Sequence, residues 1–383
     1  SRREGGPRLR IAYVSADFRV HPVGYVFSQV AGFHDRQHFE VFAYSVGPDD
    51  GSDVRRHYET AFDHFLDAQK LSVRELAERI RADQVDIAVD LNGWTADGRP
   101  EAFALRCAPV QVNWLGYAGT MGHEKLADYL IGDPVVTPVD HSDSYTETLA
   151  LLPWCYLPAE SASPPSRIPT RAEAGLPDSS FVFCSFNSAY KLNPLVIDLW
   201  SRILGDSPGS ILWLSRPPSG GDERLLCEFQ RRGISPDRIV YAARVDGRAD
   251  HLARLSLADM ALDPFPYNSH STGIEMLQAG VPMISLLGET FPSRVGASLL
   301  RSVHLDELVV DSLDAYYALA VSLYGDSTRL LSLRQKLIGE KQGDLPLFNM
   351  RGFVSNLERL YRAMWKNHQD GTRRLIDGRN LHA

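Results

Sequence analysis

Short β-rich runs alternate with helical patterns along the whole chain, and this alternation restricts the fold more than any other feature of the sequence. The order strand, helix, strand predicts parallel sheets covered by helices on both faces, which is an α/β fold. A helix is indicated between 71 and 83, where apolar residues recur at helical spacing and Ser72 with Glu75 matches a capping box. In the first half the strand runs are 9–14, 39–46, 85–91 and 110–115, with 128–131 and 149–152 as further candidates.

The alternation stops in a segment rich in Pro, Ser and Ala, residues 157–178, and then begins again. This segment predicts a linker between two Rossmann-like domains, 1–165 and 166–350, followed by an amphipathic helix and tail at 351–383. Two such domains are expected to face each other across a cleft, the usual place for a ligand between domains. The strand runs of the second half are 181–186, 210–214, 238–241, 260–262 and 282–286.

The length of the chain and its net charge limit the classes of function that this protein can have. A chain of 383 residues is too long for one hydrophobic core and suits two domains. The formal net charge of −8 argues against broad binding of nucleic acid or anionic membranes, both of which need a cationic face. The sequence contains no apolar run of membrane-spanning length, and its first ten residues lack the apolar core of a signal peptide. We therefore expect a cytoplasmic protein without nucleic-acid or membrane partners.

Nothing in the sequence indicates a bound metal. No Asp-x-Asp pair of the kind that holds a divalent ion in many glycosyltransferases is present. The four cysteines are far apart and have no histidine partners at zinc spacing, which predicts reduced thiols and no structural zinc. These cysteines are Cys107, Cys155, Cys184 and Cys227.

The segment most suggestive of binding is 267–273, which reads Tyr-Asn-Ser-His-Ser-Thr-Gly and precedes a predicted helix over 274–280. Hydroxyls, an imidazole and a glycine at a helix start suit an anion, because free backbone N–H groups and the positive end of the helix dipole point at it. His270, Ser271 and Thr272 are therefore candidate phosphate ligands. The alternative is simple N-capping by Ser271 or Thr272, which needs no ligand.

Four other residues of the second half have functional and ordinary interpretations. Glu275 either accepts hydrogen bonds from ribose hydroxyls or complements the helix dipole. Lys191, after the first strand of this half, either offsets the charge of a diphosphate leaving group or is a solvated surface lysine. His251 and Arg254 share one face of a predicted helix, where they either contact a nucleotide base or are exposed to solvent.

In the first half, Asp17 and His21 follow the first strand, where they either accept or relay a proton or are ordinary turn residues. Segment 114–120 ends another strand and contains two glycines, which allows a ligand to approach the backbone closely or makes a plain turn. All of these candidates fall after strands or at helix starts, where α/β sheets bind their ligands.

Six segments together resemble the catalytic region of the O-GlcNAc transferase family, and they appear in the family's order over about residues 8–366. The resemblance implies the two-Rossmann GT-B fold and transfer of N-acetylglucosamine from UDP-GlcNAc to Ser or Thr hydroxyls of intracellular proteins. It further implies inversion at the anomeric carbon, no metal and no other cofactor. The segments are SADFRVHPVGY, NWLGYAGTMG, FNSAYKLNP, LADMALDPFPYNSHSTGIEML, AGVPMISLLGETFPSRVGASLL and LFNMRGFVSNLERLYRAMW.

By position, the resemblance implies a donor site in the second half. Lys191 looks like the family lysine that contacts the diphosphate, and Glu275 stands where the family has a ribose-binding Asp. His270, Ser271 and Thr272 match its phosphate-binding His-Thr-Thr. The remaining matches are His251, which would pack on uracil, Arg254 and Arg248, which are basic residues beside it, and Ser188, which stands where the family has Gln.

In the first half, Asp17 and His21 match the Asp and His of the family's SDFxxHP segment, and the resemblance leaves the identity of the catalytic base open. Leu115 and Gly116 would line the sugar pocket. Tyr267 replaces a small residue near the N-acetyl group of the sugar, which leaves the choice of donor sugar open.

The resemblance is to bacterial members, because the short linker stands where animal members have a long insert. Family members carry tetratricopeptide repeats that recruit protein acceptors, and this chain has none. The alternatives are a Spindly-like protein O-fucosyltransferase that uses GDP-fucose, a relative that attaches glucose to Asn, and a non-catalytic scaffold that binds a sugar nucleotide. A dehydrogenase is disfavoured, since SADFRVH stands where a GxGxxG fingerprint would follow the first strand.

Overall fold

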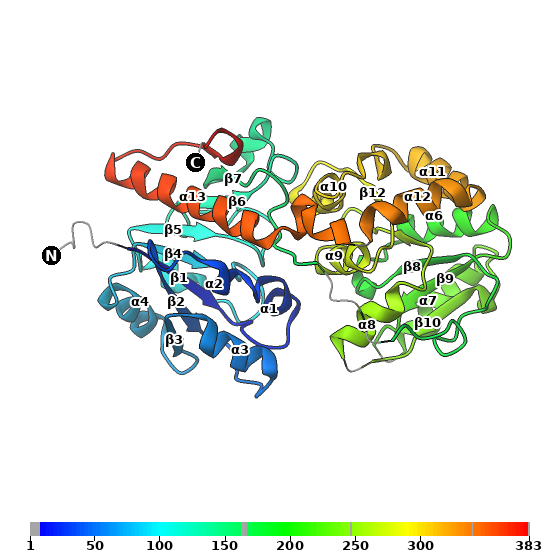
Figure 1. The fold of residues 1–383 in the computed structure, drawn as a ribbon, viewed down its shortest axis with the longest axis horizontal. Coiled ribbons are helices and arrows are strands. Elements are labelled where there is room, and N and C mark those ends of the chain that lie inside the picture. Colours follow the sequence, from blue (N-terminus) through cyan, green and yellow to red (C-terminus); the bar gives the residue numbers. More distant parts are fainter. Residues whose placement is uncertain are drawn as a thin grey trace. The chain divides into compact units, whose positions relative to one another are not determined.

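The computed structural model describes residues 8–381 except 162–164, 166, 219, 246 and 339, and it divides into two compact units (Figure 1). Unit 1 consists of Ser1–Glu160 with Pro346–Ala383, and unit 2 of Ser161–Leu345. The C-terminal helix, α13 (Met350–Gln369), therefore belongs to the same unit as the N-terminal strands.

Unit 1 is built on a parallel sheet, whose strand order in the described residues is β14-β7-β6-β5-β4-β1-β2-β3. The order reverses between β1 and β4, as in a Rossmann sheet. Its strands are β1 (Leu9–Ser15), β2 (Phe39–Ser45), β3 (His64–Asp67), β4 (Ile87–Asp90), β5 (Val110–Asn113), β6 (Tyr129–Gly132), β7 (Thr148–Leu151) and β14 (Ile376–Asp377). Its other helices are α1 (Pro22–Phe27), α2 (Val30–Phe33), α3 (Asp53–Ala61), α4 (Val73–Ala82) and α5 (Pro100–Ala104).

Unit 2 repeats this design with the order β10-β9-β8-β11-β12-β13, again entirely parallel in the described residues. The reversal lies between β8 and β11. The strands are β8 (Val182–Ser185), β9 (Ile211–Ser215), β10 (Ile239–Ala242), β11 (Met260–Leu262), β12 (Met283–Leu286) and β13 (Val309–Val310). The helices are α6 (Pro194–Gly205), α7 (Gly221–Gln230), α8 (Arg248–Leu255), α9 (Ser271–Gln278), α10 (Val295–Arg301), α11 (Leu313–Gly325) and α12 (Ser327–Leu337).

Every strand run expected from the sequence is a strand, so the prediction of two parallel α/β sheets is confirmed. The capping box at the start of α4 is also present, with the Ser72 and Glu75 side chains each accepting from the other's backbone N–H. The sequence pattern did not predict β3, β13 and β14, because β13 and β14 are two residues long and β3 is a partly exposed edge strand.

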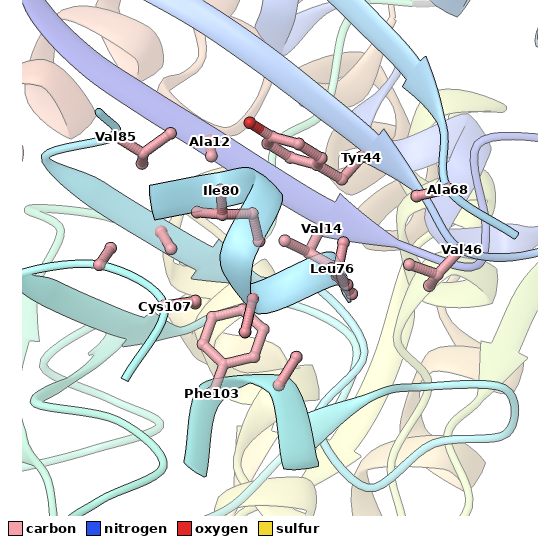
Figure 2. Packing of buried hydrophobic residues seen from close by; sticks show 14 of the residues in the cluster. Ala12, Val14, Tyr44, Val46, Ala68, Leu76, Ile80, Val85, Phe103 and Cys107 are labelled. Carbon is pink, nitrogen blue, oxygen red and sulfur yellow. The ribbon is translucent and has the colours of Figure 1, made fainter. Parts of the chain in front are cut away.

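The central strand β1 packs against helices on both faces of its sheet, because successive side chains of a strand point to opposite sides. Ala12 and Val14 lie on the face covered by α4, where Leu76 and Ile80 join the same buried cluster (Figure 2). Tyr13 is on the opposite face, beside α1 and α13. This alternation anchors β1 and fixes where the chain leaves its carboxyl end.

A buried chain of hydrogen bonds joins α13 to the remainder of unit 1. Tyr361 donates to the Tyr13 hydroxyl over 3.1 Å, and the Tyr13 oxygen lies 2.8 Å from Nε2 of His34. Nδ1 of His34 lies 2.9 Å from a Glu358 carboxylate oxygen. Burial lowers the pKa of His34, so the ring is neutral and donates from Nδ1 to the carboxylate while Nε2 accepts from Tyr13. The helix α13 is thereby tied to β1 and α2.

Replacing Glu358 with Ala is expected to lower the free energy of unfolding by about 2–3 kcal/mol, because the buried ring N–H of His34 and the partly buried backbone N–H of Asp35 both lose their acceptor. Urea unfolding followed by tryptophan fluorescence measures the change. Glu358→Gln keeps a carbonyl oxygen for both donors and is expected to cost clearly less. Equal losses in the two variants would contradict this account.

Candidate functional site

Ser188, Lys191 and His270 lie on segments that leave the two strands at which the sheet order reverses. β8 leads into residues 186–191, and β11 leads into residues 263–270. Ligands of open α/β sheets bind at the carboxyl ends of strands at such a reversal. The two segments meet, since Nζ of Lys191 donates to the carbonyl oxygen of Asn268 over 2.8 Å.

Lys191 is a buried cation without a directly bonded carboxylate among the described residues. It is 9% exposed, and Nζ also donates to Oδ1 of Asn187 over 3.2 Å, so both of its hydrogen-bond partners are neutral oxygens. Nζ lies 4.3 Å from the centre of the Tyr267 ring. Burial lowers the pKa of the ammonium to about 8, although the charge of Asp263 opposes this shift. An anionic ligand would supply the compensation that this lysine lacks.

The start of α9 lies next to Lys191. The N-cap residue is His270, and no side chain caps the helix within the described part of the chain. The interpretation that Ser271 or Thr272 is a simple N-cap is therefore wrong, since both belong to the first helical turn. Thr272 instead donates its hydroxyl to Oδ1 of Asn187 over 3.0 Å. The backbone N–H groups of Ser271 and Thr272 thus remain available to a ligand, whereas that of Gly273 donates to the His270 carbonyl oxygen over 3.0 Å.

The His270 ring is neutral. Burial, followed by the charge of Lys191, lowers the pKa of this imidazole to about 3. Its Nε2 atom is buried and has no hydrogen-bond partner among the described residues, and its ring packs edge-on against Tyr267 with 5.1 Å between centroids. A buried polar nitrogen without a partner is costly unless a ligand pairs with it.

A second group of candidates links α8 to α9. The Arg254 guanidinium lies 3.0 Å from Nδ1 of His251 and has only donors, so Nδ1 must accept. The ring proton then sits on Nε2, which faces a carboxylate oxygen of Glu275 at 3.4 Å. His251 and Arg254 also lie against the Phe186 ring. The structure therefore brings three predicted residues together and fixes the tautomer of the histidine.

Two further candidates are less constrained. Arg248 begins α8 and has its guanidinium 3.5 Å from the side-chain oxygen of Gln278. Ser188 is exposed and is the N-cap residue of the short helix η2 (Ala189–Lys191), but its side chain makes no capping hydrogen bond.

The residues that hold this site in place were not predicted from the sequence. Asp263 accepts from the Ser269 backbone N–H and the Ser285 hydroxyl, each over 2.6 Å, and burial raises its pKa to about 6. Asn187 donates to the Ser269 hydroxyl over 2.7 Å and accepts from Lys191. The available signal was an Asp directly after β11 and an Asn directly beyond β8, both at strand ends.

In unit 1 the sheet order reverses between β1 and β4, and Asp17 follows β1. Asp17 is 4% exposed, and burial raises its pKa. One carboxylate oxygen, Oδ2, accepts from Nδ2 of Asn92 over 2.8 Å, while Oδ1 lies 3.3 Å from Nδ1 of His21. The structure therefore brings Asp17 and His21 together and adds Asn92, which follows β4 and which no sequence pattern singled out.

The His21 imidazole has two neighbours that compete for Nδ1. His21 is the N-cap of α1, and Nδ1 accepts from the Val23 backbone N–H over 3.3 Å, which requires a lone pair. A hydrogen bond with Asp17 requires a proton between the two groups, either on Nδ1 of His21 or on Oδ1 of Asp17. Burial lowers the pKa of His21, which favours the neutral ring.

Leu115 and Gly116 form a tight turn beside the end of β4. Leu115 has a φ of 86°, and a Cβ on Gly116 would lie 2.2 Å from the Leu91 carbonyl oxygen. The glycine at 116 is therefore explained by backbone geometry, whereas Leu115 holds a left-handed conformation that its side chain disfavours. Contact of the two residues with a sugar stays a prediction.

The thiols and carboxylates of the chain show no metal centre where the structure describes them. All four cysteines are free thiols, as predicted, with only Cys227 exposed. In the described ranges no group of three or more His, Cys, Asp or Glu side chains is placed to hold a metal ion. None of the described helices combines the length and apolarity needed to cross a bilayer.

Comparison with known proteins gives one family and consistent relatives. The model of glycosyl transferase family 41 matches residues 1–164 and 158–357. A probable UDP-N-acetylglucosamine–peptide N-acetylglucosaminyltransferase of Arabidopsis thaliana is 38% identical over 97% of this chain and 38% of its own length. The corresponding Caenorhabditis elegans enzyme is 29% identical over 96% of this chain and 42% of its own length. This chain thus spans about two fifths of these relatives.

Comparison with solved structures also finds glycosyltransferases. A mutant of the Thermobaculum terrenum O-GlcNAc transferase superposes with a TM-score of 0.86 at 36% identity, covering 95% of this chain and 69% of that one. A Rickettsia africae glycosyltransferase, at 11% identity and a TM-score of 0.60, shares the fold alone, covering 95% of this chain and all of its own. The prediction of the GT-B class with two Rossmann-like domains is confirmed.

Proposed function

We propose that this chain, which belongs to glycosyl transferase family 41, transfers N-acetylglucosamine from UDP-GlcNAc to Ser or Thr hydroxyls of proteins. The observation that carries the proposal is the buried Lys191, which has no directly bonded carboxylate among the described residues, beside the start of α9. This arrangement suits a diphosphate, and the names of relatives that match nearly the whole chain specify UDP-GlcNAc and a peptide.

Unit 2 binds the donor in this proposal. Lys191 and the first amides of α9 stabilise the negative charge that builds on the departing diphosphate, and no metal is needed for this. The neutral His270 ring adds a hydrogen bond from or to its buried Nε2. The group of His251, Arg254 and Glu275 serves the nucleoside, with Glu275 accepting from ribose hydroxyls.

Unit 1 handles the proton. The acceptor hydroxyl attacks the anomeric carbon from the face opposite the diphosphate, which inverts the configuration at that carbon. Its proton goes to the pair formed by Asp17 and His21, whose facing atoms lie 3.3 Å apart. We place the reaction in the cytoplasm, because four free thiols fit a reducing compartment.

Calorimetric titration with UDP and with GDP, without added metal, is the first test. Binding of UDP with little response to GDP is expected, followed by transfer of GlcNAc from UDP-GlcNAc to a protein acceptor. A preference for GDP would replace the proposal with fucosyl transfer. Binding without turnover on any acceptor would favour a scaffold.

The affinity for UDP is expected to fall as the pH rises through about 8, because Lys191 loses its proton there in the free protein. The stability of the free protein changes in the opposite direction. Between about pH 8 and 10.5 the unfolded chain binds more protons at this lysine than the folded chain, so its contribution to stability rises with pH. Titrations between pH 6.5 and 9.5 test the first trend, and Lys191→Arg should flatten it.

A further inference from the structure

Asn92 connects the carboxyl ends of the two strands at which the unit 1 sheet reverses. Its Oδ1 accepts from the Ala16 backbone N–H over 2.7 Å, and its Nδ2 donates to Oδ2 of Asp17 over 2.8 Å. The same Nδ2 lies 3.2 Å from the Thr95 hydroxyl oxygen. The side chain is 1% exposed, so these contacts form without competition from solvent.

These contacts allow one orientation of the amide. A backbone N–H only donates, so the atom that faces Ala16 must be the amide oxygen. The NH₂ group then faces Asp17, and Oδ2 of Asp17 must accept. A proton on Asp17 is therefore disfavoured on Oδ2 and favoured on Oδ1, the oxygen that faces His21.

Asp90, at the end of β4, holds Asn92 in this position. One Asp90 carboxylate oxygen accepts from the backbone N–H groups of Asn92 and Gly93, each over 2.9 Å. A Cβ on Gly93 would lie 2.7 Å from the Tyr117 side chain, so the turn is packed closely against 114–120. The orientation of Asn92 is thus set by the fold.

We infer that Asn92 is a positioning residue that confines the proton taken up by the Asp17–His21 pair to the contact between Oδ1 of Asp17 and Nδ1 of His21. This inference rests on the proposed function. The acceptor oxygen bonds to the anomeric carbon, the bond from that carbon to the diphosphate breaks with its electron pair, and the hydroxyl proton moves to the pair. With Oδ2 occupied, the carboxylate charge is directed at His21 and stabilises the proton there.

The charges around the pair are few. The charged and titratable side chains that act on Asp17 are His21, Arg19 and Asp97, and Asp17 in turn acts on the buried Tyr58 hydroxyl. Arg19 lies 3.6 Å from Oδ1. Substitution of Asn92 leaves all of these groups in place, so a change in titration in an Asn92 variant reports the lost amide contact.

Asn92→Asp and Asn92→Ala test the inference through the pH dependence of kcat for UDP-GlcNAc. The carboxylate introduced by Asn92→Asp faces Oδ2 of Asp17. It should shift the acidic limb of the kcat profile to higher pH by about one unit or more. Asn92→Ala should lower kcat about 10-fold or more, and it should shift the acidic limb to higher pH by less than Asn92→Asp does. The KM for UDP-GlcNAc should change little, because the residues proposed to bind the diphosphate and the nucleoside lie in unit 2. Thr95→Val keeps the bond to Asp17 and should have the wild-type profile.

A second measurement does not require turnover. The NMR titration of His21, assigned with His21→Gln, should show a higher imidazole pKa in Asn92→Asp than in the wild type, by about half a unit or more. If the wild type transfers GlcNAc but neither the pH profile nor the His21 titration changes, the inference is wrong and the proposed function stands. If the wild type has no transferase activity, the proposed function fails, and the His21 titration alone decides whether Asn92 sets the proton position.

Discussion

Replacing Lys191 with Met is expected to lower kcat for GlcNAc transfer by about 10³-fold, while the protein melts at the same or a higher temperature at pH 7. The loss follows because the only charge of the β8 segment that faces the start of α9 disappears, and such preorganised electrostatic contacts contribute about 10²–10³-fold each. The methionine keeps the length of the stem. Burial lowers the pKa of Lys191 to about 8, so the charge at pH 7 is itself unfavourable to folding.

Three matched variants distinguish the effect of the lost charge from the effect of lost packing. Lys191→Ala should lose the same activity but also stability, because it leaves a void that the methionine side chain fills. Lys191→Arg should retain part of the activity. Lys70→Ala, at an exposed position in unit 1, should change neither quantity. Steady-state kinetics and thermal melts measure both. Turnover near the wild-type level in Lys191→Met would remove Lys191 from the mechanism.

The sequence predicted the chemically active residues of the site better than it predicted the residues that hold them in place. Lys191, His270 and Asp17 were identifiable because each can carry a charge or a proton, lies in a loop after a strand or at a helix start, and matches a motif of the family. Asn187 and Asn92 occupy the same kind of position but are ordinary turn residues, so composition does not distinguish them. Their roles depend on which strands are neighbours, and strand order is not encoded in local periodicity.

The start of α9 shows why the capping interpretation was wrong. Ser and Thr before an apolar run are the usual signature of an N-cap, and the two interpretations of Ser271 and Thr272 differed by one residue of helix boundary. In the structure the helix begins at Ser271, one residue earlier than a Ser271 cap requires and two earlier than a Thr272 cap requires, because Asp263 and Asn187 fix the preceding Ser269. Contacts between segments that are distant in the sequence therefore determine the residue at which this helix begins.

Replacing Asp17 with Asn is expected to lower kcat by about 10²–10⁴-fold, the range typical of a removed proton acceptor. The amide has nearly the same shape and can still accept from Asn92, so the loop after β1 should be preserved. Since burial raises the pKa of Asp17, ionisation costs stability once the pH exceeds the unfolded-state value. The variant should therefore unfold at an equal or higher temperature at pH 7, and pre-steady-state kinetics with thermal melts test both expectations.

Asp97→Asn is the matched control, because Asp97 is an exposed carboxylate that acts on Asp17 and has a φ of 61°, which asparagine also tolerates. It should change kcat only slightly. A cycle with His21→Gln then separates two arrangements. If Asp17 and His21 take up one proton together, the double variant should lose little more activity than the worse single variant, since groups that act as a unit are not additive. Additive losses would instead mean that the 3.3 Å contact between them is structural and that each residue acts alone.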